Sequence, residues 1–524
     1  MPRTSRAQTD CPEPHPGDPP APHDVFASAR SWPLHDTRGT RELEAALLQR
    51  WPSHTLMAWA GRRVARWVLA QAPHARRIWV AAGPGGNGGD GLHAAAHLAR
   101  QGRQVWLTLH PHASELKPAT HAALQLALDA GCELAEPAVQ QEADLVIDAL
   151  LGLGANRPLE PPMADAVRMI SAGVIPCLSI DVPTGLHADT GRALGGGLVT
   201  ARATLSLLTL KPGLLMGSGR DAVGSLWFDS LDQVRQGRCV PSVARTVGPC
   251  AAPGLAAFRS HATHKGRFGD VVAVGGAIGM SGAIRMAAHA ALAAGAGRVV
   301  VACLDPDTPL RDEFRPECMW MRPQDLPRWD LETCTVVCGC GAGPALGPWL
   351  PLLLQRSWRL VLDADALNDV AQHADLASML RNRHVRGLAT VLTPHPLEAA
   401  RLLGCTSTDV QADRLAAAKR LSSLYAATVV LKGSGTVVCS PEALPEVNVT
   451  GNAALATAGT GDVLAGWLAG RWASQEQRCD SESGWAQRIA CCAVHLHGLG
   501  ADRHGARNAV RARDLVESMH QLAS

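Results

Sequence analysis

The segment Ala458–Asp462 (AGTGD) places a carboxylate directly after two glycines, before a stretch that we expect to be helical. Glycine lets main-chain N–H groups approach an anion closely, and a helix N-terminus adds a favourable dipole. A carboxylate in the first turn could take a proton from a hydroxyl while the amides hold developing phosphate charge. The segment therefore predicts an anion-holding turn with Asp462 as the acid/base of a nucleotide-dependent enzyme. The alternative is that Asp462 only stabilises the helix start.

Three further segments of the C-terminal half carry groups suited to an anionic ligand. LKGSGT offers Lys432 and backbone donors to a polyanion, and HKGRFG places Lys265 beside a glycine. TPHPLE follows an expected strand and places His395 between prolines that fix its backbone. The chain has only five lysines against forty-four arginines, so a lysine kept beside glycine suggests that an ammonium group is needed.

In the N-terminal half, oxygen-bearing side chains follow three expected strands. The glycine-rich GPGGNGGDG carries Asn87 and Asp90, Asp148 ends the strand DLVID, and Asp181 ends the strand LSID. Three carboxylates and an amide at neighbouring strand ends could hold a hard cation or act as acid and base. Capping of the following helices would also explain each of these residues separately.

The elements that must position these groups alternate along most of the chain. Glycine clusters stand after expected strands, which is where an open parallel sheet places its ligand crevice. The alternation predicts α/β architecture, with parallel sheets covered by helices on both faces. We expect strands over residues 78–82, 105–109, 144–150, 175–180, 271–274, 299–303, 336–338, 360–363, 389–393 and 428–431, and helices over 43–70, 92–100, 121–130, 283–294 and from about 463 onward.

The length of 524 residues predicts two domains. The alternation pauses between about Asp229 and His261 in a stretch with several glycines and prolines, where we place the boundary. We expect a disordered tail over residues 1–35, because it is rich in Pro, His and Asp and has no apolar signal-peptide core. The first domain would then cover 36–235, the linker 236–255 and the second domain 256–524.

Composition excludes several classes of protein. The net charge of +2 gives no sign of a nucleic-acid partner or a membrane surface. No apolar run reaches the roughly eighteen residues that a membrane span needs. Fifteen cysteines without a C-x2-C pair favour idle thiols in a reducing cytoplasm over a zinc site. We therefore expect a cytoplasmic enzyme.

Taken together, the motifs resemble the bifunctional NAD(P)H-hydrate repair enzymes. The resemblance runs from about Thr40 to Leu522, and its most specific pieces include GGNGGDG, SIDVPTG, LDADALN, TPHPLEAARLLG and TGNAALATAGTGDVLAG. It implies a Rossmann-like epimerase domain followed by a ribokinase-like, ADP- or ATP-dependent dehydratase domain. The implied chemistry is interconversion of the R and S hydrates, then phosphorylation of the C6 hydroxyl of the S-hydrate and elimination of phosphate to restore NAD(P)H. A homo-oligomer is expected.

The resemblance also implies roles for individual residues. Asp181 and Asp462 would be catalytic, and a potassium ion would lie on Asn87, Asp148 and Thr184. The nucleotide, ADP or ATP with magnesium, would lie along Lys432, Gly433, Ser434, Gly435, Thr436 and Gly461. The hydrate would meet two sets of residues: in the epimerase Gly86, Asn87, Gly88, Gly89, Asp90, Gly152, Leu153, Gly154, Ala155, Asn156, Arg157, Pro158 and Asp181, and in the dehydratase Ala283, Gly343, His395 and Asp462.

The sequence departs from the family pattern at a few of these positions. Gly86 stands where the family usually has asparagine, and Thr184 where it has serine. The dehydratase loops read GCGAG for GPGLG and AGTGD for GGTGD, and Ala458 would reshape its loop if a positive φ were needed there. The alternative hypothesis is a ribokinase-like small-molecule kinase whose N-terminal half binds a ligand without catalysis.

Overall fold

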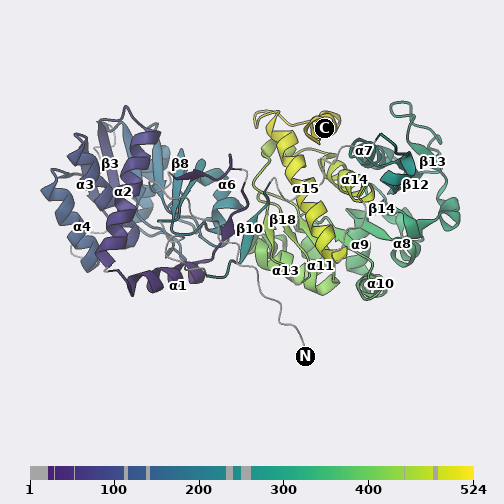
Figure 1. Cartoon of the computed structure of the whole chain (residues 1–524), viewed down its shortest axis with the longest axis horizontal. Helices are drawn as coiled ribbons and strands as arrows, with labels where there is room; N and C mark the ends of the chain where they lie inside the picture. Colours follow the sequence, from purple (N-terminus) through teal and green to yellow (C-terminus); the bar gives the residue numbers. More distant parts are fainter. Residues whose placement is uncertain are drawn as a thin grey trace. The chain divides into compact units, whose positions relative to one another are not determined.

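The computed structural model describes residues 22–28, 30–51, 53–110, 116–136, 142–231, 240–248, 261–441, 443–475 and 482–523. The chain divides into two compact units. Unit 1 comprises Met1–Ser28 and Trp32–Ala244, and unit 2 comprises Ala29–Ser31 and Arg245–Ser524 (Figure 1). The division lies between Ala244 and Arg245.

Unit 1 is built on one sheet whose strands lie in the order β1-β9-β8-β7-β6-β3-β4-β5. All neighbours pair in parallel except β1, which is antiparallel to β9. The strands are β1 (His23–Asp24), β3 (Arg77–Ala82), β4 (Gln104–Leu109), β5 (Glu133–Leu134), β6 (Leu145–Ala149), β7 (Cys177–Ile180), β8 (Ala203–Leu207) and β9 (Ser225–Asp229).

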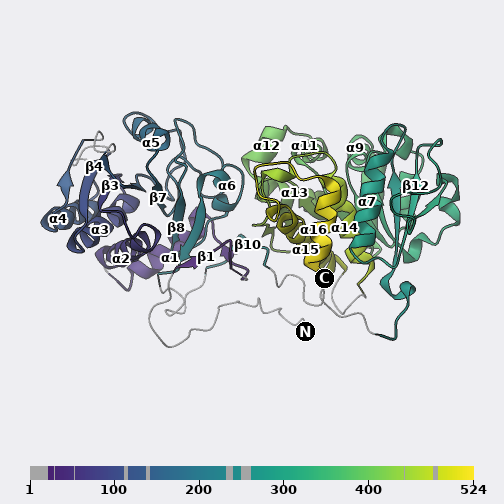
Figure 2. The ribbon, with the colours of Figure 1, turned by 90° about the horizontal axis from the view of Figure 1, so that it is seen from above.

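Helices cover both faces of this sheet. One apolar cluster joins Ile78, Val80 and their counterparts on neighbouring strands to one group of helices, and a second joins Trp79 and Ala81 to α5. Alternate residues of a strand point to opposite faces, so the two clusters are the two sides of one sheet. α5 accordingly lies across the strands from α2 and α3 (Figure 2). The helices are α1 (Thr37–Leu48), α2 (Ser53–Gln71), α3 (Gly86–Arg100), α4 (Pro118–Asp129), α5 (Met163–Ala172) and α6 (Gly219–Ala222).

Unit 2 has a longer sheet, in which the strand order is β13-β12-β11-β14-β15-β16-β17-β18-β19-β10. Its strands from β13 to β17 are parallel, β18 is antiparallel to both neighbours, and β10 is parallel to β19. The strands are β10 (Ala244–Thr246), β11 (Asp270–Gly275), β12 (Arg298–Cys303), β13 (Met319–Met321), β14 (Thr335–Cys338), β15 (Arg359–Leu362), β16 (Thr390–Leu392), β17 (Thr428–Leu431), β18 (Val437–Cys439) and β19 (Glu446–Val447).

One face of the second sheet carries a single apolar cluster that includes Val271, Val337, Val361 and Val430. Helices α7, α14, α15 and α16 cover this face, and glycines in α14 let it approach α7 closely: a Cβ at Gly466 would lie 2.0 Å from the carbonyl oxygen of Ala287. The helices of unit 2 are α7 (Ser281–Ala293), α8 (Leu350–Arg356), α9 (Asp365–Gln372), α10 (Ala374–Val385), α11 (Pro396–Leu403), α12 (Ser407–Ala412), α13 (Arg414–Tyr425), α14 (Thr460–Ala473), α15 (Glu482–Asp502) and α16 (Ala512–Ala523).

These sheets confirm the predicted α/β architecture of both halves, and they correct some details. The glycine-rich stretch at Gly83–Gly91 is not all loop, because α3 already begins at Gly86. The disordered tail expected over residues 1–35 is wrong for its described part, since β1 and the short strand β2 (Pro33–Leu34) lie there and Leu34 bridges Leu210. Residues 1–21 lie outside the described residues.

Candidate active sites

The first site forms at the carboxyl ends of the parallel strands of unit 2, where α14 begins. Gly459 is the residue before the helix and has a φ of 90°, which glycine adopts without strain. The N–H groups of the first helical turn have no partner within the helix and are free for an anion. Asp462 lies in that same turn, so the predicted combination of amides and one carboxylate is present.

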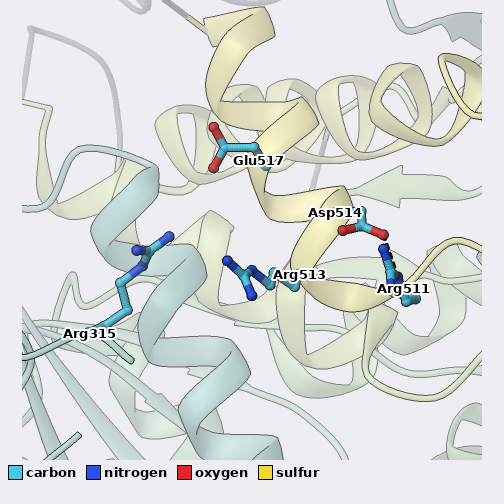
Figure 3. Close-up of a pocket in the computed structure, with 5 residues that line it drawn as sticks. All are labelled: Arg315, Arg511, Arg513, Asp514 and Glu517. Carbon is cyan, nitrogen blue, oxygen red and sulfur yellow. Dashed lines mark hydrogen bonds and ion pairs between the residues drawn. The ribbon is translucent and has the colours of Figure 1, made fainter. Parts of the chain in front are cut away.

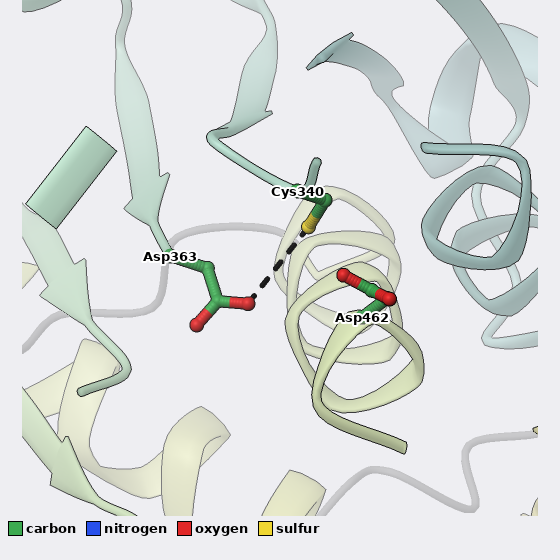
Figure 4. A group of neighbouring side chains, drawn as sticks. All are labelled: Cys340, Asp363 and Asp462. Atoms are coloured by element: carbon green, nitrogen blue, oxygen red, sulfur yellow. Dashed lines mark hydrogen bonds between the residues drawn. The ribbon is translucent and has the colours of Figure 1, made fainter. Parts of the chain in front are cut away.

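Asp363, which follows β15, links this helix to the neighbouring loops. Its Oδ1 accepts hydrogen bonds from Lys432 Nζ (2.7 Å) and Thr393 Oγ1 (2.7 Å), and its Oδ2 lies 3.9 Å from the thiol of Cys340. Figure 4 shows the side chains of Cys340, Asp363 and Asp462 facing one another, and ligand atoms of all three lie within 4.8 Å of each other. Two carboxyl groups, one thiol and one ammonium group therefore share a small, largely buried space.

This crowding sets the protonation of Asp462. Burial and, after it, the negative charge of Asp363 raise the pKa of Asp462 to about 6, although Cys340 and Lys432 act in the opposite direction. A carboxyl with a pKa just below neutral is ionised at pH 7 and can still release a proton readily. That is the property expected of a general base.

The loop after β17 accepts hydrogen bonds from a buried arginine, Arg414. The Arg414 guanidinium donates to the carbonyl oxygens of Leu431 (3.1 Å), Lys432 (3.2 Å) and Gly435 (3.4 Å). Gly433, with a φ of 135°, packs directly on that guanidinium. Because these carbonyls point to Arg414, the loop can turn its other side, with Lys432, toward the start of α14, where a Cβ at Gly461 would lie 3.4 Å from Lys432 Nζ.

His395 plays a local role at the start of α11. Its Nδ1 accepts from the N–H groups of Leu397 (3.1 Å) and Glu398 (3.3 Å), and Glu398 accepts from the N–H of His395 (2.8 Å). Burial raises the pKa of Glu398 to about 7, with Lys432 opposing the rise, and burial lowers the pKa of His395. His395 is therefore a helix cap whose Nε2 lies 3.2 Å from Glu398 Oε1 and whose side chain is 46% exposed.

Ala283 and Gly343 lie in two neighbouring segments, the first turn of α7 and the loop after β14. A Cβ at Gly341 would lie 2.9 Å from that of Ala283, so the loop after β14 rests on the first turn of α7. Gly343 has a φ of 51° and donates its N–H to Asp365 (2.8 Å). Ala458 creates no conflict, because among the described residues of its loop the positive φ belongs to Gly459 and not to Ala458. The suggested reshaping of that loop is therefore wrong.

The second site forms in unit 1 around Asp148, which is fully buried at the end of β6. Its oxygens accept from Ser179 Oγ (2.8 Å), from Thr184 Oγ1 (2.6 Å) and from the Thr184 N–H (2.9 Å). The backbone N–H of Leu151 in turn donates to Thr184 Oγ1 (3.0 Å). The threonine hydroxyl thus occupies the centre of this cluster.

Asn87 approaches the cluster from the start of α3. A Cβ at Gly152 would lie 3.2 Å from Asn87 Cγ, which places the amide against the turn that follows β6. Both polar atoms of the amide are buried and have no hydrogen-bond partner. A buried amide without a partner is costly, so this one fits a site for a further ligand.

Asp181 lies after β7 with a φ of 64°, a conformation that non-glycine residues rarely adopt. Its Oδ1 accepts from the ammonium group of Lys211 and from the N–H of Leu207 (3.1 Å). Asn87, Asp90, Asp148 and Asp181 do not cap any described helix, and the residue before α3 is Gly85. The capping interpretation of these four residues is therefore wrong.

The other residues of unit 1 that were predicted to contact the hydrate have fewer neighbours or are more exposed. Gly152 adjoins Asn87, but the segment from Gly154 to Pro158 is largely exposed and turns back through Leu159, whose N–H donates to Gly195. A Cβ at Gly86 would meet no atom within 4 Å. The glycine found there in place of asparagine thus leaves open space and does not fill a packed position.

Comparison with known proteins identifies the family to which the chain belongs. Residues 53–213 match the family "YjeF-related protein N-terminus", and residues 271–521 match the family "NAD(P)H-hydrate dehydratase". The bifunctional NAD(P)H-hydrate repair enzyme of Escherichia coli is 35% identical over 94% of this chain and 94% of its own, and that of Leishmania braziliensis is 35% identical over 86% of each.

This chain belongs to the bifunctional NAD(P)H-hydrate repair enzymes. The family expected from the sequence, with its epimerase and ADP/ATP-dependent dehydratase activities, is confirmed. A solved ADP/ATP-dependent NAD(P)H-hydrate dehydratase from Bacillus subtilis, co-crystallized with ATP and Mg²⁺, is 25% identical and covers 51% of this chain and 94% of its own, with a TM-score of 0.43. Within the described residues, no helix is long and apolar enough to cross a membrane.

Several residues of this repair enzyme's sites were missed in the sequence. Asp363 and Glu398 stand inside quoted motifs, LDADALN and TPHPLE, and their position after a strand was the available signal. Lys211 and Arg414 gave no signal, because each reaches its partners from a segment well separated in sequence.

A further pocket of about 410 Å³ lies at the start of α16 and contains no predicted site residue. Figure 3 shows Arg513, Asp514 and Glu517 on α16, with Arg511 directly before the helix and Arg315 facing them from another segment. Arg511 pairs with Asp514 at 2.6 Å. Because both positive and negative side chains line this pocket, we interpret it as a solvated hollow of the surface. We assign no part of the reaction to it.

Proposed function

We propose that unit 2 carries out the nucleotide-dependent dehydration, with Asp462 as the general base. The observation that supports this most strongly is the position of Asp462 in the first turn of α14, beside free backbone amides and across from Lys432. Amides and an ammonium group hold a phosphate, and the carboxylate can accept a hydroxyl proton at the same place.

The proposed reaction has two steps. Asp462 takes the proton of the C6 hydroxyl as the hydroxyl oxygen attacks the terminal phosphorus of the nucleotide. The bond from that phosphorus to the bridging oxygen breaks, and the nucleotide leaves with one phosphate fewer. In the second step, phosphate leaves C6 with the C–O electron pair and C5 loses a proton. The double bond between C5 and C6 is thereby restored. The hydrate would meet Ala283, Gly343 and His395, and the nucleotide would lie along Lys432, Gly433, Ser434, Gly435, Thr436 and Gly461.

The donor set of this site fits a magnesium ion that accompanies the nucleotide. Magnesium prefers carboxylate and phosphate oxygens, and Oδ2 of Asp363 faces the shared space while Oδ1 is held by Lys432 and Thr393. Asp363 would hold the ion, which when bound neutralises phosphate charge. The thiol of Cys340 is a poor ligand for magnesium and would stay outside its shell.

We propose that unit 1 carries out the epimerisation, with Asp181 at the reacting carbon and the hydrate along Gly86–Asp90 and Gly152–Pro158. A potassium ion fits Asn87, Asp148 and Thr184, because all three offer oxygen atoms and the buried Asn87 amide has no partner of its own. When bound, the ion would fix the turn after β6 against α3 and so shape the hydrate site.

Two broader expectations accompany this proposal. The shared family with bacterial repair enzymes supports a cytoplasmic location. A homo-oligomer is likewise proposed, and sedimentation of the purified chain tests it directly.

Incubation with chemically prepared S-hydrate of NADH tests the dehydratase proposal. Absorbance at 340 nm should recover when ATP or ADP is added with magnesium and stay flat without nucleotide. Running both nucleotides and both NADH and NADPH hydrates in parallel identifies the preferred pair. If none of these combinations restored the absorbance at 340 nm, the proposal would be overturned.

A further inference from the structure

Helix α1 carries none of the predicted site residues, yet it is attached to the segment that follows β8. The Oγ1 atoms of Thr40 and Thr209 share a hydrogen bond of 2.7 Å, and both side chains are buried. The N–H of His35, which lies just before the helix, donates to the carbonyl oxygen of Leu210 (2.9 Å). Buried polar groups keep their protein partners because they cannot turn to water. α1 is therefore held close to the carboxyl end of β8.

The first turn of α1 is fixed at two further points. The side chain of Asp36 caps the helix by accepting from the N–H of Gly39 (2.8 Å). The carboxylate of Asp189, in the segment between β7 and β8, accepts from both the N–H (2.7 Å) and the hydroxyl (2.9 Å) of Thr37. The helix thus keeps a defined position over this end of the sheet.

The middle of α1 reaches the turn that follows β6. A Cβ at Gly154 would lie 3.7 Å from Nη2 of Arg41. In the sheet, β7 lies between β6 and β8, and Asp181 directly follows β7. Since α1 is attached beyond the end of β8 and also reaches the turn beyond β6, it crosses the end of the strand between them. Arg41 therefore lies at the edge of the sheet where an open parallel sheet binds its ligand.

The guanidinium group of Arg41 is available to a ligand. The residue is exposed, and among the residues that the structure describes it forms no ion pair and no side-chain hydrogen bond. Glu44 of the same helix acts on it only at longer range. Arg38, one turn earlier, is instead paired with Glu42 at 2.8 Å. An unpaired guanidinium at the edge of a ligand site suits a phosphate group, which it can hold through two parallel hydrogen bonds.

We propose that Arg41 is a substrate-binding residue of the epimerase and that its guanidinium holds a phosphate group of the hydrate. The proposal rests on the function proposed above for unit 1. The turn after β6 supports it, because Gly152 lies against Asn87 of α3 and Gly154 lies against Arg41 of α1. A hydrate along this turn would therefore pass between the two helices. Hydrated NADH offers its diphosphate to Arg41, and hydrated NADPH offers a 2′-phosphate as well.

The test follows conversion of R-hydrate to S-hydrate by chromatography, with the full chain and potassium but no nucleotide, so that no hydrate is dehydrated. Arg41→Ala should raise KM about tenfold and leave kcat within about threefold, because a charged contact to phosphate is lost. Arg41→Lys keeps the charge and should recover most of the wild-type KM. A rise in KM for the hydrates of both NADH and NADPH assigns the contact to the diphosphate, and a rise for the NADPH hydrate alone assigns it to the 2′-phosphate.

Arg38→Ala, at the paired arginine of the same helix, is the matched control and should leave KM for both hydrates unchanged. Added tetramethylammonium chloride, at constant potassium, should raise the KM of the wild type more steeply than that of Arg41→Ala, because salt screens exposed charges. An unchanged KM in Arg41→Ala for both hydrates, an equal rise in Arg38→Ala, or a fall in kcat without a rise in KM would overturn this inference. Conversion by Asp181→Asn at the wild-type rate would instead overturn the proposed function of unit 1.

Discussion

The two sites use a lysine and two aspartates in opposite ways. In unit 1, Lys211 contacts Asp181 itself, and the second carboxyl, Asp90, is the one whose pKa is raised well above its usual range. In unit 2, Lys432 contacts the neighbour Asp363, and burial raises the pKa of Asp462 to about 6. In each unit, therefore, the carboxyl whose pKa is raised is not the one that the ammonium group contacts.

The two sites also differ in where the strained backbone lies. In unit 2 the positive φ of 90° falls on Gly459, which tolerates it, and Asp462 sits in ordinary helix. In unit 1 the positive φ falls on Asp181 itself. Such a conformation costs about 1–3 kcal/mol in a non-glycine residue. The orientation of the Asp181 carboxylate in unit 1 thus depends on the surrounding contacts. In unit 2, the orientation of Asp462 follows from its place in the first turn of a helix.

The largest expected effect comes from removing the base of unit 2. Asp462→Asn should lower the rate of S-hydrate dehydration by about 10²–10⁴-fold, because the hydroxyl proton loses its acceptor. Interconversion of R- and S-hydrate, followed by chromatography, should continue at the wild-type rate. A dehydration rate within a few-fold of wild type would refute the role of Asp462.

Lys432→Met should have the next largest effect, about 100-fold on kcat/KM for the nucleotide, because both the phosphate and Asp363 lose a cation. Steady-state kinetics over a range of ATP concentrations measures it. Lys419→Met, at an exposed lysine on α13, is the control and should behave as wild type. Equal effects of the two substitutions would contradict the assignment.

Arg414→Leu tests whether the nucleotide loop depends on its buried arginine. Three carbonyl groups would lose their donor, so we expect the KM for nucleotide to rise about tenfold and unfolding free energy to fall by about 2 kcal/mol or more. Denaturant unfolding and nucleotide titration measure the two quantities. A normal KM in a destabilised chain would limit Arg414 to a structural role.

The pH dependence of dehydration sharpens the comparison further. The rate should fall as pH drops through about 6, because Asp462 becomes protonated. Asp363→Asn removes the nearby negative charge, so the pKa of Asp462 should fall and the acid limb should move to lower pH, by about one unit or less. If the acid limb of the pH profile moved to higher pH instead, the negative charge of Asp363 would not be what raises the pKa of Asp462.

Cys340→Ala should have the smallest effect, about threefold or less on kcat. The thiol lies 3.9 Å from Asp363 Oδ2, and its contact with Asp462 opposes the rise in the pKa of that carboxyl. Kinetics of S-hydrate dehydration at pH 7 measures the change. A loss as large as that of Asp462→Asn would place the thiol in the reaction.

Much of this comparison could be predicted from the sequence. The strand from Thr428 to Leu431 was expected with its observed bounds, and the others within a few residues, because buried parallel strands are short, continuous apolar runs. Lys432 could be predicted because it adjoins glycine after a strand, and Asp462 because it follows glycines where a helix was expected to begin. The helix α3 was predicted from Leu92, and its first residues, Gly86–Gly91, were missed because glycine is a poor helix former; contacts with neighbouring strands override that preference.

The partners of the catalytic carboxyls could not be predicted from spacing. Lys211 reaches Asp181 across thirty residues of chain, and Lys432 reaches Asp363 across sixty-nine. The positive φ of Asp181 is likewise imposed by neighbouring strands and not by its own sequence. Tertiary contacts therefore set the surroundings of both catalytic carboxyls.

An equal mixture of R- and S-hydrates of NADH, treated with ATP and magnesium, tests the central claim of two separate sites in one chain. The wild type should restore all of the 340 nm absorbance at enzymatic rates. Asp181→Asn should restore the S-hydrate half quickly and the rest only at the spontaneous rate of interconversion, and Asp462→Asn should restore none. Rapid recovery of both halves by Asp181→Asn would contradict the account.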